Sequence, residues 1–199
     1  MDSQQILIFL VTFSSILILP GPNAAFAVGQ SLRYGVIKSL PVQLGFMSAT
    51  GVHAMLVLCG MGLLIQEHII ILRLLKWVGV IYLIYLAYKL FTAAPSTITV
   101  PLQEVSSAKM FWSAMLVSLT NPKALLASIM IYPLFIDDGQ AYFFQAIVLI
   151  CSAMSVSFLI YLTYSLMAAA LQHRLTGSQT ANKTVACFYL GAAGVLSAK

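Results

Sequence analysis

The sequence predicts an all-α membrane protein with six transmembrane helices, arranged as a 3+3 inverted repeat in which helices 1 and 4 are broken. Three observations lead to this prediction. Hydrophobic residues make up 61% of the 199 residues and charged residues only 8%, whereas about a quarter of the residues in soluble domains are charged. The chain divides into six apolar runs, and a bilayer crossing takes about 20 residues. Prolines interrupt two of these runs at matching places.

The apolar runs define the spans and the two halves. The stretch 93–109 contains Pro95, Pro101 and several Ser and Thr residues, which is typical of a loop. We therefore expect a first three-helix repeat at 1–92, a cytoplasmic loop at 93–109 and a second three-helix repeat at 110–199. A weak internal similarity supports this division, because Pro22 is followed 100 positions later by Pro122. The expected spans are residues 6–28, 40–65, 69–91, 110–136, 142–171 and the short 184–198.

The distribution of basic residues predicts the orientation in the membrane. Cytoplasmic loops carry an excess of Lys and Arg, and one side of the predicted bundle collects most of them: Arg33, Lys38, Lys89, Lys109, Arg174 and Lys183. The other side holds Arg73, Lys76 and Lys199 together with Asp2, Glu67, Asp137 and Asp138. We expect both termini outside the cytoplasm. Ala25-Phe26-Ala27 imitates a signal-peptidase site, but the start Met1–Gln4 has no positive charge and two prolines lie within the first apolar segment, which argues against cleavage.

The two interruptions predict a polar site at membrane depth. They are Pro20-Gly21-Pro22-Asn23 in the first span and Asn121-Pro122-Lys123 in the fourth. Proline has no amide hydrogen, so helical partners are lost for the carbonyls four residues earlier, those of Ile16, Ile18 and Ser118. Such groups are costly in hydrocarbon unless protein or a water-filled cavity satisfies them. Paired broken helices are how secondary transporters build a midplane site.

Each interruption also looks like the start of a helix. Asn121 is a good N-cap and Pro122 suits the first helical position, and Gly21-Pro22 repeats the pattern with a weaker cap. A helix start offers free amides and partial positive charge, which suits a carboxylate, whereas the freed carbonyls suit an ammonium group. We therefore predict a site for a zwitterion. The alternative is that both interruptions are ordinary proline kinks, which are frequent in membrane helices.

Three further residues are candidates for this site. Lys123 lies about 20 Å along its helix from Lys109, too deep to reach the interface easily, and intramembrane charges are functional by default. His53 lies near the centre of the second span and has an unperturbed pKa of about 6.5, so it is a candidate proton carrier; a neutral histidine bonded to a neighbouring helix is the alternative. Tyr82 is a candidate for lining the cavity.

Several other functions lack the residues they need. No Asp or Glu lies within the six predicted span cores, so a buried proton relay and a site for a cationic substrate have no carboxylate. The three histidines are isolated, which leaves no enzyme site, metal site or cofactor site. No basic cluster for nucleic acid occurs. Cys59, Cys151 and Cys187 are far apart, and we interpret them as small core residues.

These motifs resemble those of the LysE/RhtB family of amino-acid exporters. The resemblance rests on Pro20-Gly21-Pro22-Asn23, on the stretch from Gly45 to His53, on Lys76-Trp77-Val78-Gly79 and on Leu119 to Ala124. It implies a bacterial inner-membrane protein that exports amino acids, is driven by protons and forms a homodimer. The site residues that it implies are Pro20, Gly21, Pro22, Asn23, Asn121, Pro122 and Lys123.

The chain departs from family members that export basic amino acids. Those members tend to have acidic residues within the membrane, and here the comparable region offers His53. We therefore expect a neutral cargo such as leucine, homoserine or threonine, held by the residues above together with Ser118. Two rival hypotheses are a non-transporting membrane scaffold or subunit and an exporter of another small zwitterionic metabolite.

Overall fold

The computed structural model of the chain describes residues 1–61, 105–137 and 139–175, with isolated residues between 70 and 92 and between 183 and 197. Every regular element in these described ranges is a helix. Two helices there are long and apolar enough to cross a membrane, and the number rises to four if each of two sharply bent pairs is one span. The predicted all-α class is confirmed, and the chain bends sharply at both predicted interruptions.

The first broken span consists of helices α1 and α2. Helix α1 (Ser3–Ile18) starts with a capping box in which the side chain of Asp2 accepts from the amide of Gln5. Helix α2 (Pro22–Tyr34) has Gly21 as its N-cap and Pro22 at its start, as the sequence predicts. The two helices meet at an angle of 68°.

A single residue, Gly35, connects α2 to helix α3 (Val36–Leu56). Its φ angle is 78°, a backbone conformation that favours glycine. Both helices extend beyond the expected span limits at residues 28 and 40, up to this glycine. The short π-helix η1 (Val57–Met61) continues α3, with Gly60 at a φ angle of 85°.

The second broken span repeats the design of the first. Helix α6 (Ser107–Leu119) ends before Asn121, and helix α7 (Pro122–Ile131) begins after it. The side chain of Asn121 accepts from the amide of Lys123, so the predicted N-cap is confirmed. The two parts are bent by 62°. A short 3-10 helix, η2 (Tyr132–Phe135), extends α7.

Helix α8 (Tyr142–Leu175) is the longest described element, with 34 residues, or about 51 Å at the helical rise. Its first turn is tied to the preceding loop by Gln145, whose side chain accepts from the amide of Asp137 and donates to the carbonyls of Asp137 and Gln140. Gln145 is fully buried, so the turn before α8 has a defined shape.

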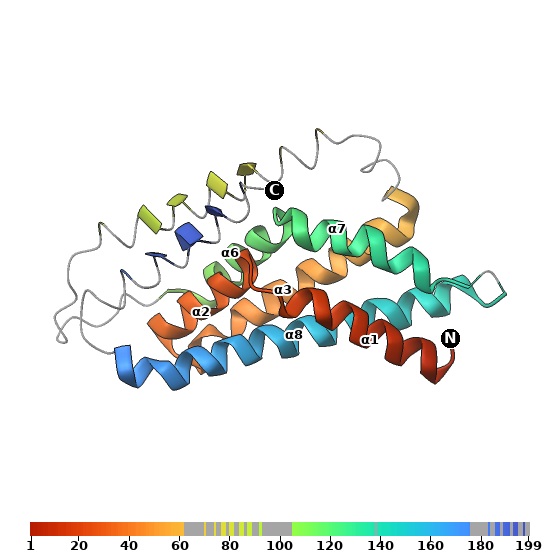
Figure 1. Cartoon of the computed structure of the whole chain (residues 1–199), viewed down its shortest axis with the longest axis horizontal. Coiled ribbons are helices and arrows are strands. Elements are labelled where there is room, and N and C mark those ends of the chain that lie inside the picture. Colours follow the sequence, from red (N-terminus) through yellow and green to blue (C-terminus); the bar gives the residue numbers. More distant parts are fainter. Residues whose placement is uncertain are drawn as a thin grey trace.

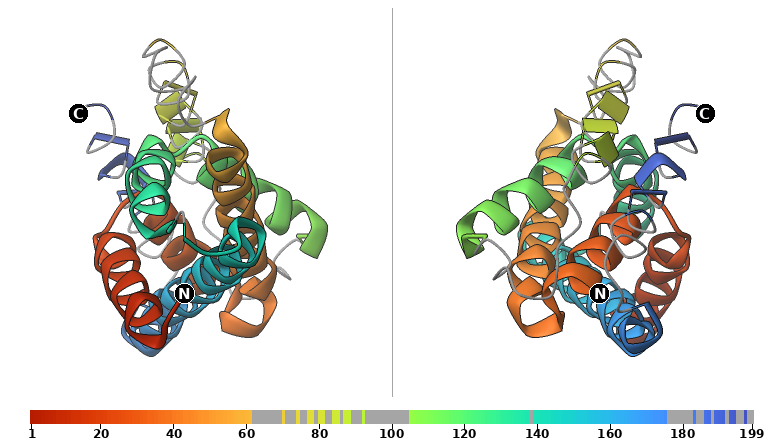
Figure 2. Two further views of the ribbon diagram at one scale, coloured as in Figure 1. Left: turned by 90° about the vertical axis from the view of Figure 1, so that its right-hand side faces the viewer. Right: turned by 90° about the vertical axis from the view of Figure 1, so that its left-hand side faces the viewer.

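The helices run between two common ends (Figure 1). At the first, which we call the Met1 end, the amino group of Met1 donates to the side chain of Gln140, and the hydroxyl of Tyr142 donates to the carbonyl of Leu58. At the other, which we call the Lys38 end, α2 turns into α3, α6 begins and α8 ends. Seen end-on, α1, α3, α7 and α8 surround a common centre (Figure 2).

Close packing in this bundle depends on small and polar residues, as is usual where lipid supplies no hydrophobic drive between helices. A Cβ atom added at Gly45 of α3 would lie 2.5 Å from the carbonyl oxygen of Phe111 in α6, so a glycine is required for this approach. Between α3 and α8, the hydroxyl of Thr50 bonds to Ser157 at 3.0 Å. A hydrogen bond between hydroxyl groups therefore links α3 to α8 in the interior of the bundle.

The interpretation of the cysteines as core residues is wrong. Cys59, Cys151 and Cys187 are all exposed on the protein surface. An apolar run in a membrane protein has a lipid-facing side, so hydrophobic neighbours in the sequence do not imply burial inside the protein.

Most of the expected third and sixth spans, the loop 93–104, Glu67 and Asp138 lie outside the described residues.

Candidate functional site

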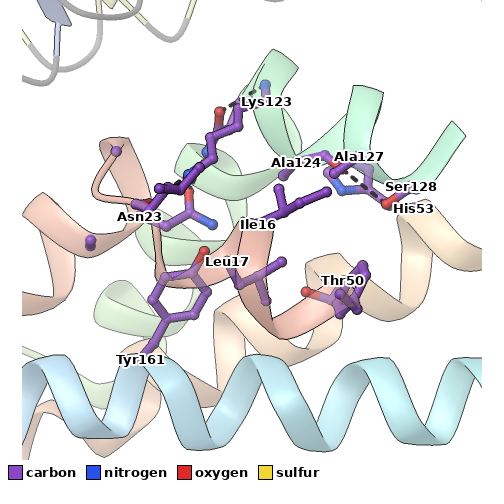
Figure 3. A pocket seen from close by; sticks show the side chains of 15 residues that line it. Ile16, Leu17, Asn23, Thr50, His53, Lys123, Ala124, Ala127, Ser128 and Tyr161 are labelled. Atoms are coloured by element: carbon purple, nitrogen blue, oxygen red, sulfur yellow. Dashed lines mark hydrogen bonds between the residues drawn. The ribbon is translucent and has the colours of Figure 1, made fainter. Parts of the chain in front are cut away.

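The two helix breaks touch through their asparagine side chains. Nδ2 of Asn121 donates to Oδ1 of Asn23 at 3.0 Å, and Nδ2 of Asn23 donates to Oγ of Ser118 at 3.0 Å. All three residues are at least 96% buried. The hydroxyl of Tyr161 in α8 also faces Asn23 (Figure 3). The first and fourth predicted spans are therefore joined at their interruptions by a buried polar chain.

The carbonyls at the end of α1 are satisfied by side chains from the second half of the protein. Nζ of Lys123 donates to the carbonyl of Leu19 at 2.5 Å, and the hydroxyl of Tyr164 donates to the carbonyl of Ile18 at 2.5 Å. The carbonyl of Ile16 accepts from the amide of Leu19 within the last turn. Of the carbonyls predicted to lose helical partners, that of Ile18 has gained a partner from another helix.

The second break also leaves carbonyls without their usual helical partners. The carbonyl of Ser118 accepts from the amide of Asn121 at 3.1 Å. The amide of Lys123 bonds to the side chain of Asn121, so it does not close the usual helical bond to the carbonyl of Leu119. The ring of His53 lies near this carbonyl of Leu119. His53 on α3 thus contacts the break in the fourth span.

A hollow lies where these elements meet, with a volume of about 450 Å³, its open mouth included. Figure 3 shows Lys123 and Asn23 at one side of it and His53 and Ser128 at the other. Among the described residues that line the hollow, Lys123 has the only formal charge with His53 neutral, and none is Asp or Glu. The apolar part of the lining comes from α1, α2 and α7: Phe13, Ile16, Leu17, Leu19, Ala24, Ala124 and Ala127.

The predicted site residues divide into three groups in the structure. Gly21, Asn23, His53, Asn121 and Lys123 line the hollow. Ser118 supports it by accepting from Asn23, and Pro22 and Pro122 are buried at the helix starts. Pro20 is exposed on the surface and is not among the residues that line the hollow. Tyr82 lies outside the described residues.

Sequence reasoning missed four polar residues of this region: Thr50, Ser128, Tyr161 and Tyr164. None of the four belongs to the two proline motifs, although Thr50 lies within the stretch from Gly45 to His53. The helical period is the signal that could have found them. Thr50 lies three residues before His53 and therefore on the same face of α3, and Tyr161 and Tyr164 share a face of α8 in the same way.

The arrangement suits the binding of a small zwitterion better than a covalent reaction. It combines an ammonium group, two amide side chains, two helix starts and broken-helix carbonyls around one hollow. Helix starts favour anions and carbonyls favour cations. In the described lining, no hydroxyl is paired with a base in the manner of a nucleophile.

Comparisons with known proteins agree with a transport function. The chain is 30% identical over 172 residues to a Vibrio cholerae protein called an uncharacterized membrane protein, covering 86% of this chain and 84% of that one. It is 27% identical to the homoserine/homoserine lactone efflux protein of Salmonella typhi, covering 85% and 82%. It is 24% identical to the leucine efflux protein of Salmonella choleraesuis, covering 95% and 92%.

No solved structure matches the chain. The sequence pattern of one protein family, described as the LysE type translocator, matches residues 14–199. These translocators are membrane transporters, and the match covers most of the chain. The resemblance in the two broken-helix motifs is therefore confirmed by similarity over nearly the whole length, and the chain belongs to the LysE type translocator family.

Proposed function

We propose that the protein exports a small neutral amino acid across the bacterial inner membrane by alternating access. Family membership supports export, and relatives named for homoserine and leucine efflux support a neutral cargo. The lining supports the same class, because in its described part a single cation, Lys123, and no acid face the hollow. A second positive charge on the cargo would have no carboxylate to pair with.

The observation that carries this proposal is the bond from Nζ of Lys123 to the carbonyl of Leu19 at 2.5 Å. In this structure, a primary ammonium group donates a hydrogen bond to a carbonyl that the first helix break leaves without its helical partner. The α-ammonium of an amino acid has the same chemistry. We infer that the cargo's ammonium replaces Lys123 at this carbonyl, beside the carbonyl of Ile18 that accepts from Tyr164, and that Lys123 is then free to bind the cargo's carboxylate.

The carboxylate in this proposal lies between the two helix starts. The amide side chains of Asn23 and Asn121 flank it, and the starts of α2 and α7 direct partial positive charge toward it. Gly21 leaves room beside Lys123, because an added Cβ atom would lie 3.7 Å from Cδ of that lysine. The remaining members of the proposed site shape the breaks: Pro20, Pro22, Ser118 and Pro122.

The proposed architecture is the six-helix inverted repeat. The first repeat occupies 1–92 and the second occupies 110–199, with the loop 93–109 in the cytoplasm. The basic residues near Lys38 and Lys109 favour the Lys38 end as cytoplasmic, which puts both termini in the periplasm. We also propose that the protein is a homodimer, as the family resemblance implies.

We further propose that export is coupled to protons through His53. This residue lines the hollow beside Thr50 and Ser128, and Lys123 is the charged group that faces the same space. A protonated His53 and the ammonium of Lys123 would repel each other. Protonation of His53 and release of the cargo can therefore alternate. Export in vesicles that lack a proton gradient tests this step.

Transport into inside-out membrane vesicles tests the exporter proposal. Asn121→Ala and Lys123→Ala, checked for correct insertion, should reduce uptake of labelled neutral amino acids at least several-fold. Lys109→Ala is the matched control, because Lys109 is an exposed lysine at the start of α6, and it should retain the parental rate. Parental rates in both test variants would show that the site assignment is wrong. Absence of saturable uptake by the parental protein would favour a scaffold.

A further inference from the structure

The hollow has two polar sides with an apolar stretch between them. On one side are Asn23 and Lys123, and on the other are His53 and Ser128 (Figure 3). Asn121 lies with Asn23, to which it donates a hydrogen bond. The zwitterionic head of the cargo is proposed to bind at the first side. The opposite side then faces the cargo's own side chain, so its chemistry decides which amino acid fits.

His53 has an unused hydrogen-bonding atom on this second side. The residue is only 2% exposed, and its Nε2 atom is buried with no hydrogen-bond partner among the described residues. A neutral imidazole whose proton is on Nδ1 has a lone pair on Nε2, which can accept a hydrogen bond from a ligand. Buried groups of this kind are rare in folded proteins and call for an explanation.

The two hydroxyl groups beside His53 are also acceptors rather than donors toward the hollow. The hydroxyl of Ser128 donates to the carbonyl of Ala124 at 2.9 Å. The hydroxyl of Thr50 lies 2.9 Å from the carbonyl oxygen of Phe46 and 3.0 Å from Oγ of Ser157, so its hydrogen is used within the protein. Each hydroxyl has one hydrogen, so each offers only lone pairs to a ligand. This side of the hollow therefore needs a ligand that donates a hydrogen bond.

A hydroxyl group is the side chain that meets this need. An alkyl side chain would leave Nε2 of His53 buried and unpaired. A cationic side chain would also donate, but no carboxylate occurs in the described lining to balance its charge beside Lys123. We propose that His53 is a specificity residue that accepts a hydrogen bond from the side-chain hydroxyl of a small hydroxyl-bearing amino acid. This inference rests on the exporter function and names its substrate class.

Efflux from proteoliposomes containing the full chain tests this proposal. The two cargoes are homoserine and norvaline, whose side chains differ only by a hydroxyl in place of a methyl group. The measured quantity is the ratio of their initial rates, which does not depend on how much protein is inserted. A site that binds a hydroxyl discriminates strongly against the analogue that lacks it, and we expect the parental ratio to favour homoserine by about tenfold or more.

Variants of the acceptor side separate this role from a structural one. His53→Leu should bring the ratio close to one, whereas His53→Gln, which keeps an acceptor oxygen, should retain part of the preference. Thr50→Val should lower the ratio even if the His53 variants do not insert. Its matched control is Thr163→Val, because Thr163 is exposed on α8 and donates to its own helix.

The possible outcomes distinguish the two proposals. Equal export of homoserine and norvaline by the parental protein would overturn the specificity role and leave the exporter function intact. An unchanged preference in His53→Leu, with both cargoes still moving, would overturn it as well. If neither these two nor any other neutral amino acid moves, the exporter function itself fails, and the inference fails with it.

Discussion

Nδ2 of Asn121 donates to Oδ1 of Asn23 at 3.0 Å, and this bond joins the two helix breaks of the protein across 98 positions of sequence. Both side chains are almost fully buried. Asn121 also caps α7 through the amide of Lys123. One residue thus starts a helix and links that start to the other break, so its two roles can be separated by substitution.

Asn121→Ser should keep the cap and lose the link, whereas Asn121→Ala should lose both. Serine is as good an N-cap as asparagine, and loss of a cap costs about 1 kcal/mol. Loss of the link costs about 1 kcal/mol more. We therefore expect the thermal inactivation midpoint in detergent to fall in the order parent, Ser, Ala. Ser106→Ala is the control, because Ser106 precedes α6 without a side-chain cap bond. Equal midpoints for the two Asn121 variants would contradict the separate roles.

Tyr164→Phe should weaken the end of α1. The hydroxyl of Tyr164 donates to the carbonyl of Ile18, and an unsatisfied carbonyl in an apolar setting costs about 1–3 kcal/mol. We expect a lower inactivation midpoint and slower export. The matched control is Tyr34→Phe, since Tyr34 contacts Arg33 through its ring, which phenylalanine keeps. If both variants behave alike, the hydroxyl of Tyr164 has no special part in holding the break.

Gly45→Ala should separate α3 from α6. The added methyl group would lie 2.5 Å from the carbonyl oxygen of Phe111 and 3.0 Å from Cβ of Ala114. Such overpacking costs about 1–3 kcal/mol, more than the gain of about 1 kcal/mol from replacing a helical glycine by alanine.

Gly51→Ala is the control for this prediction. It lies in the same helix, but its nearest neighbour would be the flexible end of the Met154 side chain, which can move. Inactivation midpoints should fall for Gly45→Ala and change little for Gly51→Ala. A stable, fully active Gly45→Ala variant would mean that the two helices are not as close as described.

The contact between Met1 and Gln140 predicts that both lie on one side of the membrane. Single cysteines at Asp2 and Gln140, introduced after replacing the three native cysteines, should react with a membrane-impermeant thiol reagent in intact cells. Cysteines at Lys38 and Lys109 should react only after the cells are opened. Labelling of positions 2 and 140 from opposite sides would rule out the described arrangement of α1 and α8.

The breaks could be predicted from the sequence because their causes are local. Proline removes its own amide hydrogen, and Asn121 caps a helix that begins one residue later. The residues that satisfy the freed carbonyls could not be predicted, since Lys123 and Tyr164 reach Leu19 and Ile18 across 104 and 146 positions. Those partners are set by how helices pack, which a single sequence does not display.

The same distinction explains the remaining differences. Helix α2 continues beyond the expected span limit at residue 28, because the apolar signal fades before Gly35, where the positive φ angle ends the helix. The cysteines were assigned to the core because lipid-facing and protein-facing apolar residues look alike in sequence. His53 was recognised as a central residue, but its contact with Leu119 depends on the fold.

Protection of a single cysteine by cargo tests most directly whether amino acids bind where the two breaks meet. Ala124→Cys, in a chain whose native cysteines are replaced, puts a thiol in the hollow, and Lys109→Cys puts one at an exposed reference position. The predicted result is that a transported neutral amino acid slows labelling of position 124 several-fold and leaves position 109 unchanged. Equal labelling of position 124 with and without saturating cargo would contradict the proposed site.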